Sequence, residues 1–170
     1  MFELKIPKSR VGVLIGKKGE TKRLIQKNTK CKLEISAEGD VIITGESVDE
    51  FICENVVKAV GRGFNPLIAL NLINDEYLLE IINIKEFTKG SEKKFKRIKS
   101  RLIGTQGKTR KVIERLTNCN LVIYGKTVSL IGGVETIIIA RKGVEKLLSG
   151  SPHGNVYGFI EREIRKLKIK

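Results

Sequence analysis

The chain has 170 residues, of which 41% are hydrophobic and 31% are charged; this balance excludes a disordered polar chain, and the apolar stretches are far shorter than the roughly 20 residues of a membrane span. Lys and Arg number 33 against 19 Asp and Glu, a net charge of +14, which predicts a polyanionic partner. No signal peptide is visible at the start, and the three cysteines lack the spacing of a disulfide framework or a zinc site, so we expect a cytoplasmic protein with reduced thiols and no metal or other cofactor.

The first third of the chain predicts six elements in the order β-α-α-β-β-α. Alternating apolar residues predict a strand at its start, and a glycine follows the first short helix, where a helix C-terminus is expected. The third helix has a serine cap and apolar residues along one face. In chain order the elements are Phe2–Pro7, Ser9–Ile15, Glu20–Lys30, Lys32–Ser36, Val41–Thr44 and a helix capped by Ser47.

The same unit occurs a second time. When the chain is shifted by 88 residues, 14–35 falls on 102–123 with ten identities in 22 positions, most of them apolar residues or glycines. Two copies at this spacing indicate a duplicated domain rather than a solenoid. The second set of elements is Tyr77–Glu86, Ser91–Ile103, Lys108–Asn118, Leu121–Tyr124, Val128–Ile131 and Val134–Leu148.

Four segments are therefore predicted. Residues 1–64 and 76–150 form two α+β domains, each with a three-stranded antiparallel sheet packed by helices. Residues 65–75 form a connecting helix, in which Asn65 is the cap and Pro66 the first residue. Residues 151–170 form a C-terminal extension helix.

Two glycines three residues apart separate the first two helices of each copy, in Gly16-Lys17-Lys18-Gly19 and in Gly104-Thr105-Gln106-Gly107. Such a loop permits a tight reversal, lets another backbone approach closely, and points the N–H groups of the next helix at a phosphate. A single Gly-x-x-Gly is best read as an ordinary helical turn. Two of them within this repeated order resemble the clamp of KH domains, which holds about four nucleotides, and the order of elements is that of a type I KH domain.

Gly107-Lys108-Thr109 also has the ending of a phosphate-binding P-loop. That motif needs a further glycine where Leu102 stands, and it follows a strand, whereas this segment follows a predicted helix. The P-loop interpretation is therefore rejected.

The KH resemblance also implies where bases bind, in a groove between the first two helices and the second strand. Gly12 and Ser100 are then the small residues that let a base come close. The resemblance also implies an apolar floor to this groove. Its residues could equally belong to the hydrophobic core, which is the expected role of Ile25 and Ile113. The floor or the core beneath it is formed by Ile15, Ile25, Leu33, Ile103, Ile113 and Leu121.

Positive charge is concentrated in the second half of the chain. Residues 1–66 carry a net charge of +3 and residues 67–170 carry +11, with the excess in 91–115. A solvated helix face would account for such a run, but this one leads into the second loop and continues beyond it, which favours a phosphate track. The predicted RNA-binding residues are Arg10, Gly12, Gly16, Lys17, Lys18, Gly19, Lys22, Arg97, Ser100, Arg101, Gly104, Thr105, Gln106, Gly107, Lys108, Arg110 and Lys111.

One position in each copy departs from the usual KH pattern, and this departure points to a particular KH family. Generic KH domains have an apolar residue three positions after the second glycine, where this chain has Lys22 and Arg110. Together with the second loop and the tail 150–161, this resembles the Pno/Dim family of KH proteins, which act in maturation of the small ribosomal subunit. The resemblance implies binding of single-stranded RNA at the 3′ end of 16S rRNA or its precursor, with a Nob-type endonuclease and the alpha subunit of translation initiation factor two as protein partners. The segment Val156-Tyr157-Gly158 is then either a partner surface or a turn that packs the last helix.

No arrangement of residues indicates catalysis, so we expect no enzyme activity. His153 is the only histidine, and Cys31 and Cys119 occupy equivalent positions between apolar neighbours, where a buried thiol is expected. Two functions remain open. The first is a sequence-preferring binder of single-stranded RNA in ribosome assembly, and the second is a protein adaptor that docks the endonuclease or the initiation factor and has mainly electrostatic affinity for RNA.

Overall fold

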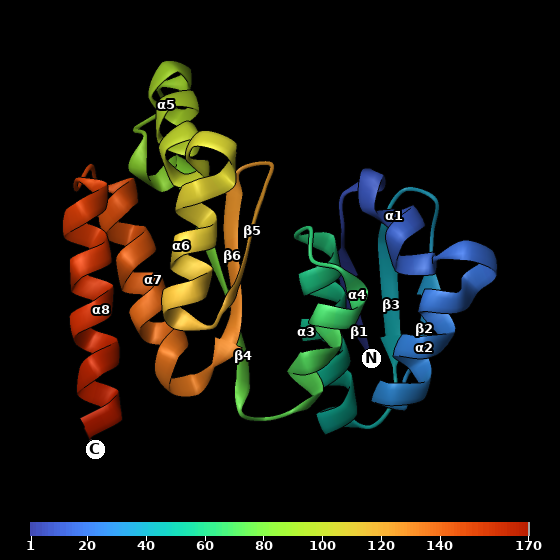
Figure 1. Ribbon diagram of the computed structural model, residues 1–170. Helices are drawn as coiled ribbons and strands as arrows, with labels where there is room; N and C mark the ends of the chain where they lie inside the picture. Colours follow the sequence, from blue (N-terminus) through green and yellow to red (C-terminus); the bar gives the residue numbers. More distant parts are fainter. Residues whose placement is uncertain (170) are drawn as a thin grey trace. The chain divides into compact units, whose positions relative to one another are not determined.

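The computed structural model describes residues 1–169 and divides the chain into two units, residues 1–77 and residues 78 onward (Figure 1). Lys170, the last residue of the predicted C-terminal extension, lies outside the described residues. The first unit contains β1 (Phe2–Lys5), α1 (Lys8–Ile15), α2 (Glu20–Thr29), β2 (Lys32–Ile35), β3 (Asp40–Thr44), α3 (Ser47–Gly61), α4 (Pro66–Ala69) and the 3-10 turn η2 (Leu70–Ile73). The second contains β4 (Tyr77–Asn83), which begins at the last residue of the first unit, and then α5 (Glu92–Ile103), α6 (Lys108–Thr117), β5 (Asn120–Tyr124), β6 (Thr127–Gly133), α7 (Val134–Leu148) and α8 (His153–Ile169).

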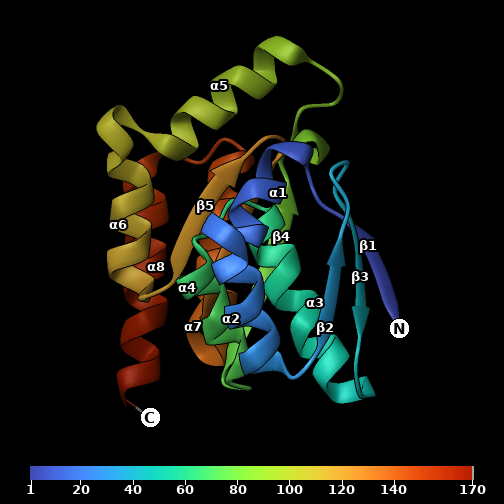
Figure 2. The ribbon, with the colours of Figure 1, turned by 90° about the vertical axis from the view of Figure 1, so that its right-hand side faces the viewer.

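The predicted α+β class and the β-α-α-β-β-α order are confirmed in both units. Each unit holds a three-stranded sheet with its last strand in the centre, in the orders β1-β3-β2 and β4-β6-β5. The strands β2 and β3 pair antiparallel with Leu33 opposite Ile43, and β5 and β6 pair antiparallel with Leu121 opposite Leu130. These apolar pairs are buried against the helices, which lie on one side of the first sheet in Figure 2. The second strand of each unit is therefore an edge strand of its sheet.

Two segments next to the junction of the units differ in detail from the expected elements. The strand expected to reach Glu86 ends at Asn83, because the Asn83 side chain accepts a hydrogen bond from the Lys85 N–H at 3.0 Å and the chain turns into η3 (Ile84–Phe87). The segment 65–75 holds α4 and η2, and the Asn65 side chain accepts a hydrogen bond from the Leu67 N–H at 2.9 Å.

The last helix, α8, belongs to the core of the second unit. Its residues Val156 and Ile160 are fully buried in the same cluster as residues of α5, α6 and α7. The helix comes close to α7 at Gly143, where an added Cβ would clash with the Ile160 side chain. Figure 1 shows α8 and the sheet on opposite sides of α6 and α7. Within the segment Val156-Tyr157-Gly158, Val156 therefore packs the helix onto its unit.

The turn between the first two helices has the same backbone in both units. Its first glycine has a φ of 73° at Gly16 and 74° at Gly104, and its second has a φ of 76° at Gly19 and 72° at Gly107. A Cβ on Gly104 would clash with the Thr109 hydroxyl, whereas a Cβ on Gly107 would meet no atom within 4 Å. The residue before the second glycine, Lys18 or Gln106, also lies in the left-handed region. The first glycine is therefore required by packing as well as by backbone conformation. At the second glycine backbone conformation is the main requirement, since a Cβ on Gly19 would meet only the flexible Arg23 guanidinium, at 3.1 Å.

The three thiols are buried, as free cysteines. Burial raises the pKa of the Cys53 thiol to about 12 and also raises the pKa of Cys31 and Cys119. The sulfur atoms of Cys31 and Cys119 fill the space where a Cβ of Gly45 or Gly132 would lie, so the two copies share a cysteine–glycine contact. Within residues 1–169, none of the helices has the length and apolar character of a membrane span.

The two glycines of the second loop are expected to respond differently to alanine. Gly107→Ala introduces a strained left-handed alanine, which costs about 1 kcal/mol of unfolding free energy. Gly104→Ala adds a clash with Thr109 to the same strain, so its cost is expected to exceed that of Gly107→Ala by about 1 kcal/mol or more. Thermal unfolding followed by circular dichroism measures the difference, and equal losses in the two variants would contradict the packing role of Gly104.

The buried thiols are expected to be inert in the folded protein. A disulfide reagent attacks the thiolate, and a raised pKa keeps the thiols protonated at pH 8. Titration with a chromogenic disulfide should detect fewer than one reactive thiol in the native protein and all three in guanidinium chloride. A thiol that reacts rapidly in the native state would show that one of the three sites opens.

Candidate nucleic-acid interface

Each Gly-x-x-Gly loop presents an open backbone at the start of a helix. The N–H of Gly19 bonds to the carbonyl of Gly16 and that of Gly107 to Gly104, both at 3.2 Å, which closes the turn. The first-turn N–H groups of α2 and α6 that follow have no partner within their own helix. Since nothing stands within 4 Å of the open side of Gly107, a phosphate can approach the loop there.

In each unit one hydrogen bond joins the second helix to the edge strand of the sheet beside it. In the first unit the Gln26 side chain of α2 accepts the N–H of Leu33 at 2.8 Å, and in the second the Glu114 carboxylate of α6 accepts the N–H of Leu121 at 2.9 Å. Both bonds join the second helix to the edge strand of the sheet. The two walls that bound a KH groove are therefore connected directly.

The small residues of the first helices lie at the surface. Gly12 and Ser100 are exposed, and their carbonyls accept the N–H groups of Gly16 and Gly104 at 2.9 Å. An added Cβ on Gly12 would meet no atom within 4 Å, so the surface is open at that point.

The predicted apolar floor divides into core and surface. Ile15 and Ile103 are partly exposed beside the loops. The other four side chains belong to the core, namely Ile25, Leu33, Ile113 and Leu121.

Two arginines expected to contact RNA are engaged within the fold. The Arg10 guanidinium donates to the carbonyls of Val60 at 2.8 Å and Phe64 at 2.9 Å, at the end of α3. The Arg101 guanidinium donates to the carbonyls of Leu147 at 3.0 Å and Ser151 at 2.6 Å, at the end of α7. Hydrogen bonds to unpaired C-terminal carbonyls give both side chains a helix-capping role that was not expected, and their contact with RNA stays a prediction.

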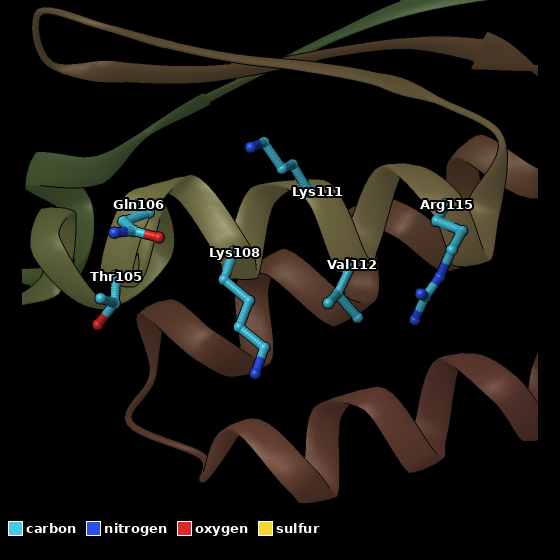
Figure 3. A pocket seen from close by; sticks show the side chains of 6 residues that line it. All are labelled: Thr105, Gln106, Lys108, Lys111, Val112 and Arg115. Carbon is cyan, nitrogen blue, oxygen red and sulfur yellow. The ribbon is translucent and has the colours of Figure 1, made fainter.

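The second unit has a hollow along α6, with a volume of about 620 Å³. Figure 3 shows the loop residues Thr105 and Gln106 at one end, and three side chains that project from one face of the helix, Lys108, Val112 and Arg115. Lys111 also lines the hollow. Val112 and Arg115 were not among the predicted residues, although their spacing of four and seven from Lys108 places them on the same helical face.

A second hollow, of about 540 Å³, lies beside the loop and is lined by residues of α5, α6 and α8. Six predicted residues meet there, and Thr105 and Lys108 line both hollows. Thr109 of α6 and, from the start of α8, His153 and Tyr157 complete the lining and were not predicted. The six predicted residues are Arg97, Ser100, Arg101, Gly104, Thr105 and Lys108.

The basic side chains around the second loop are not neutralised by acids. In the part of the chain that the structure describes, none of the carboxylates forms an ion pair with Arg97, Lys108, Arg110 or Lys111. Arg97, Lys108 and Lys111 are exposed, and Arg110 is half-buried. An uncompensated positive surface of this kind attracts a polyanion and holds it through its phosphates.

The first loop has its own positive charge. Lys17 and Lys18 are exposed at its tip, and Lys22 is half-buried in the first turns of α2. Arg23 donates to the Lys18 carbonyl at 2.8 Å, which supports the left-handed backbone of the loop. The corresponding residue of the second unit is Lys111, whose side chain instead lines the α6 hollow.

Among the described residues, no group of three or more His, Cys, Asp or Glu side chains is placed to hold a metal ion. The single histidine donates through Nε2 to the Arg101 carbonyl at 2.9 Å. This histidine lies beside the second loop together with Tyr157, among cations and small residues.

Comparison with known protein families identifies both units. Residues 78–165 match the family of the second KH domain of Pno1, described as a eukaryotic-type KH domain (KH domain type I), and residues 1–59 match the KH domain family. The type I arrangement expected from the order of elements is thus confirmed.

Similar proteins come from archaea and eukaryotes. A KH domain-containing protein of Methanocaldococcus jannaschii is 48% identical over 170 residues, covering 97% of this chain and 74% of that protein. The pre-rRNA-processing protein pno1 of Aspergillus oryzae is 33% identical over 119 residues, and the match spans 68% of this chain but only 45% of that protein.

Solved structures share the whole fold. Dim2p from Pyrococcus horikoshii has a TM-score of 0.87 at 42% identity, covering 95% of this chain and 98% of that one. A similar TM-score, 0.88 at 42% identity, is found for a Pyrococcus horikoshii complex of a/eIF2alpha, aDim2p and rRNA, with 97% and 94% coverage. The tandem loops, the type I topology and these similarities together show that the chain belongs to the archaeal Dim2/Pno1-like family of tandem KH-domain proteins.

Proposed function

We propose that this protein binds single-stranded RNA at the 3′ end of 16S rRNA or its precursor, during maturation of the small ribosomal subunit. The observation that carries the proposal is the pair of Gly-x-x-Gly loops with the same left-handed backbone, each at the head of a helix that is tied to the adjacent edge strand. A relative of known structure occurs in a complex with rRNA, which supports RNA as the ligand.

The side chains proposed to contact RNA fall into two roles. The loops hold the sugar-phosphate backbone, through N–H groups and through Lys17 and Lys18 in the first unit or Thr105 and Gln106 in the second. The remaining cations track the strand on either side of a loop, and bases enter the groove past Gly12 or Ser100. The tracking cations are Lys22, Arg97, Lys108, Arg110, Lys111 and Arg115.

An adaptor role is the second candidate. The Pyrococcus horikoshii complex contains a/eIF2alpha together with aDim2p and rRNA, which favours docking of the initiation factor alpha subunit here as well. The family resemblance adds a Nob-type endonuclease as a further candidate partner. If adaptor function dominates, RNA affinity is mainly electrostatic and falls steeply with salt, without preference for sequence.

Loop variants separate the two candidates. Fluorescence anisotropy is measured with a labelled strand that copies the 16S rRNA 3′ end, a scrambled strand and a duplex, at two salt concentrations. Lys17→Asp/Lys18→Asp and Thr105→Asp/Gln106→Asp are each expected to weaken binding of the authentic strand about ten-fold or more, because carboxylates then face its phosphates. Asparagine pairs at the same positions are the matched controls, since Asn also tolerates the left-handed backbone of Lys18 and Gln106. Equal binding of all three RNAs, unaffected by either aspartate pair, would reject groove readout and leave the adaptor.

Two arginines on the same face of α5, Arg97 and Arg101, allow RNA binding and helix capping to be tested separately. Arg101→Lys is expected to lower the free energy of unfolding by about 1–3 kcal/mol, because it removes charged hydrogen bonds to Leu147 and Ser151. Arg97→Gln is expected to leave stability unchanged and to weaken RNA binding. Thermal unfolding and anisotropy on both variants measure the two effects, and a reversed outcome would exchange the assigned roles.

A further inference from the structure

The start of α8 places two aromatic rings beside the second loop. His153 and Tyr157 lie one helical turn apart, with ring centroids 6.2 Å apart and planes inclined by 59°. Both are partly exposed, and both line the 540 Å³ hollow that also includes Ser100, Thr105 and Lys108. The helix that carries them follows the six elements of the KH unit, so it is an addition to that unit.

Hydrogen bonds fix this pair relative to the loop. The Nε2–H of His153 donates to the carbonyl of Arg101, three residues before Gly104, at 2.9 Å. The guanidinium of the same Arg101 donates to the carbonyl of Ser151, two residues before His153, at 2.6 Å. This reciprocal contact, together with the buried Val156, holds the rings in a defined position with little ordering left to occur on binding.

The chemistry of the hollow suits a nucleotide. Arg97 and Lys108 supply two cations that no described carboxylate neutralises, and none of the residues that line the hollow is acidic. The aromatic rings supply faces on which any base can stack. An acidic peptide would use the cations but has no need of the rings, so the combination favours RNA over a protein ligand.

Continuity with the loop indicates which nucleotide would bind. Thr105 and Lys108 line this hollow as well as the one along α6 (Figure 3), so a strand held by the loop passes from one hollow to the other. We propose that Tyr157 and His153 form an accessory nucleotide subsite, which stacks the base next to the four held by the second KH clamp while Arg97 and Lys108 contact its phosphate. This inference rests on the proposed function, because it requires the strand to cross the second loop.

The first test compares two substitutions of the same side chain. Tyr157→Leu keeps an apolar group against the core but removes the aromatic face, and is expected to weaken binding of the 16S 3′-end strand about five-fold or more, the lower range for loss of one base stack. Tyr157→Phe keeps the face and is expected to bind within two-fold of the parent protein. Thermal unfolding of both variants shows whether either change acts through stability.

The second test reports stacking without any loss of packing. The chain has no Trp and three Tyr, so Tyr77→Phe/Tyr124→Phe leaves Tyr157 as the only tyrosine fluorophore. Saturating 16S 3′-end strand is expected to quench this fluorescence, whereas a strand of four nucleotides that fills only the clamp is expected to leave it nearly unchanged. Absence of quenching by the longer strand under saturation would overturn the subsite.

The variant Thr105→Asp/Gln106→Asp separates failure of the subsite from failure of the proposed function. If this variant loses affinity but Tyr157→Leu binds like the parent, the subsite is rejected and the clamp stands. If the loop variant binds normally, the clamp of the second unit is rejected and the subsite with it. If Tyr157→Leu loses only the initiation factor alpha subunit and keeps RNA, the segment is a protein surface and the nucleotide subsite is wrong.

Discussion

The left-handed turn between the first two helices is the constraint on which the binding site depends. A chain of L-residues reaches this conformation with least strain at glycine, and the turn places one glycine at each end. At its first glycine a threonine hydroxyl occupies the space of a side chain, while at the second glycine of the second loop that space is empty. The same turn therefore closes against the protein on one side and opens toward a ligand on the other.

In each unit a single side chain–backbone hydrogen bond connects the helix that follows the loop to the edge strand of the sheet. Gln26 and Glu114 are different residues at the same place in the repeat, and both accept an N–H of the edge strand. An amide and a carboxylate oxygen are equivalent acceptors in this role. The bond is thus present in both copies although the chemical group that makes it differs, so the second helix is joined to the edge strand in the same way in both units.

The two units also share a helix cap that is made by an arginine side chain. Arg10 and Arg101 stand at positions three residues apart in the repeat, yet their guanidiniums bond to equivalent carbonyls at the ends of α3 and α7. Residues three apart share a helix face, so either position can reach the same helix end. In the second unit this cap also meets His153, and it links the end of α5, the end of α7 and the start of α8 around the loop.

Sequence by itself determined the duplicated β-α-α-β-β-α order, the α+β class, the two Gly-x-x-Gly turns and the basic segment before the second loop. These features follow from periodicity, glycine spacing and net charge, which are local properties of the chain. Tertiary structure alone decided which cation caps a helix: Arg97 and Arg101 are indistinguishable by their spacing on one helix, but it is Arg101 that donates to the carbonyls of Leu147 and Ser151. It also decided that Tyr157 and His153 stand beside a loop some 50 residues earlier in the chain. Such contacts depend on how helices pack across long sequence separations, and no local pattern encodes which distant carbonyl or ring a side chain will meet.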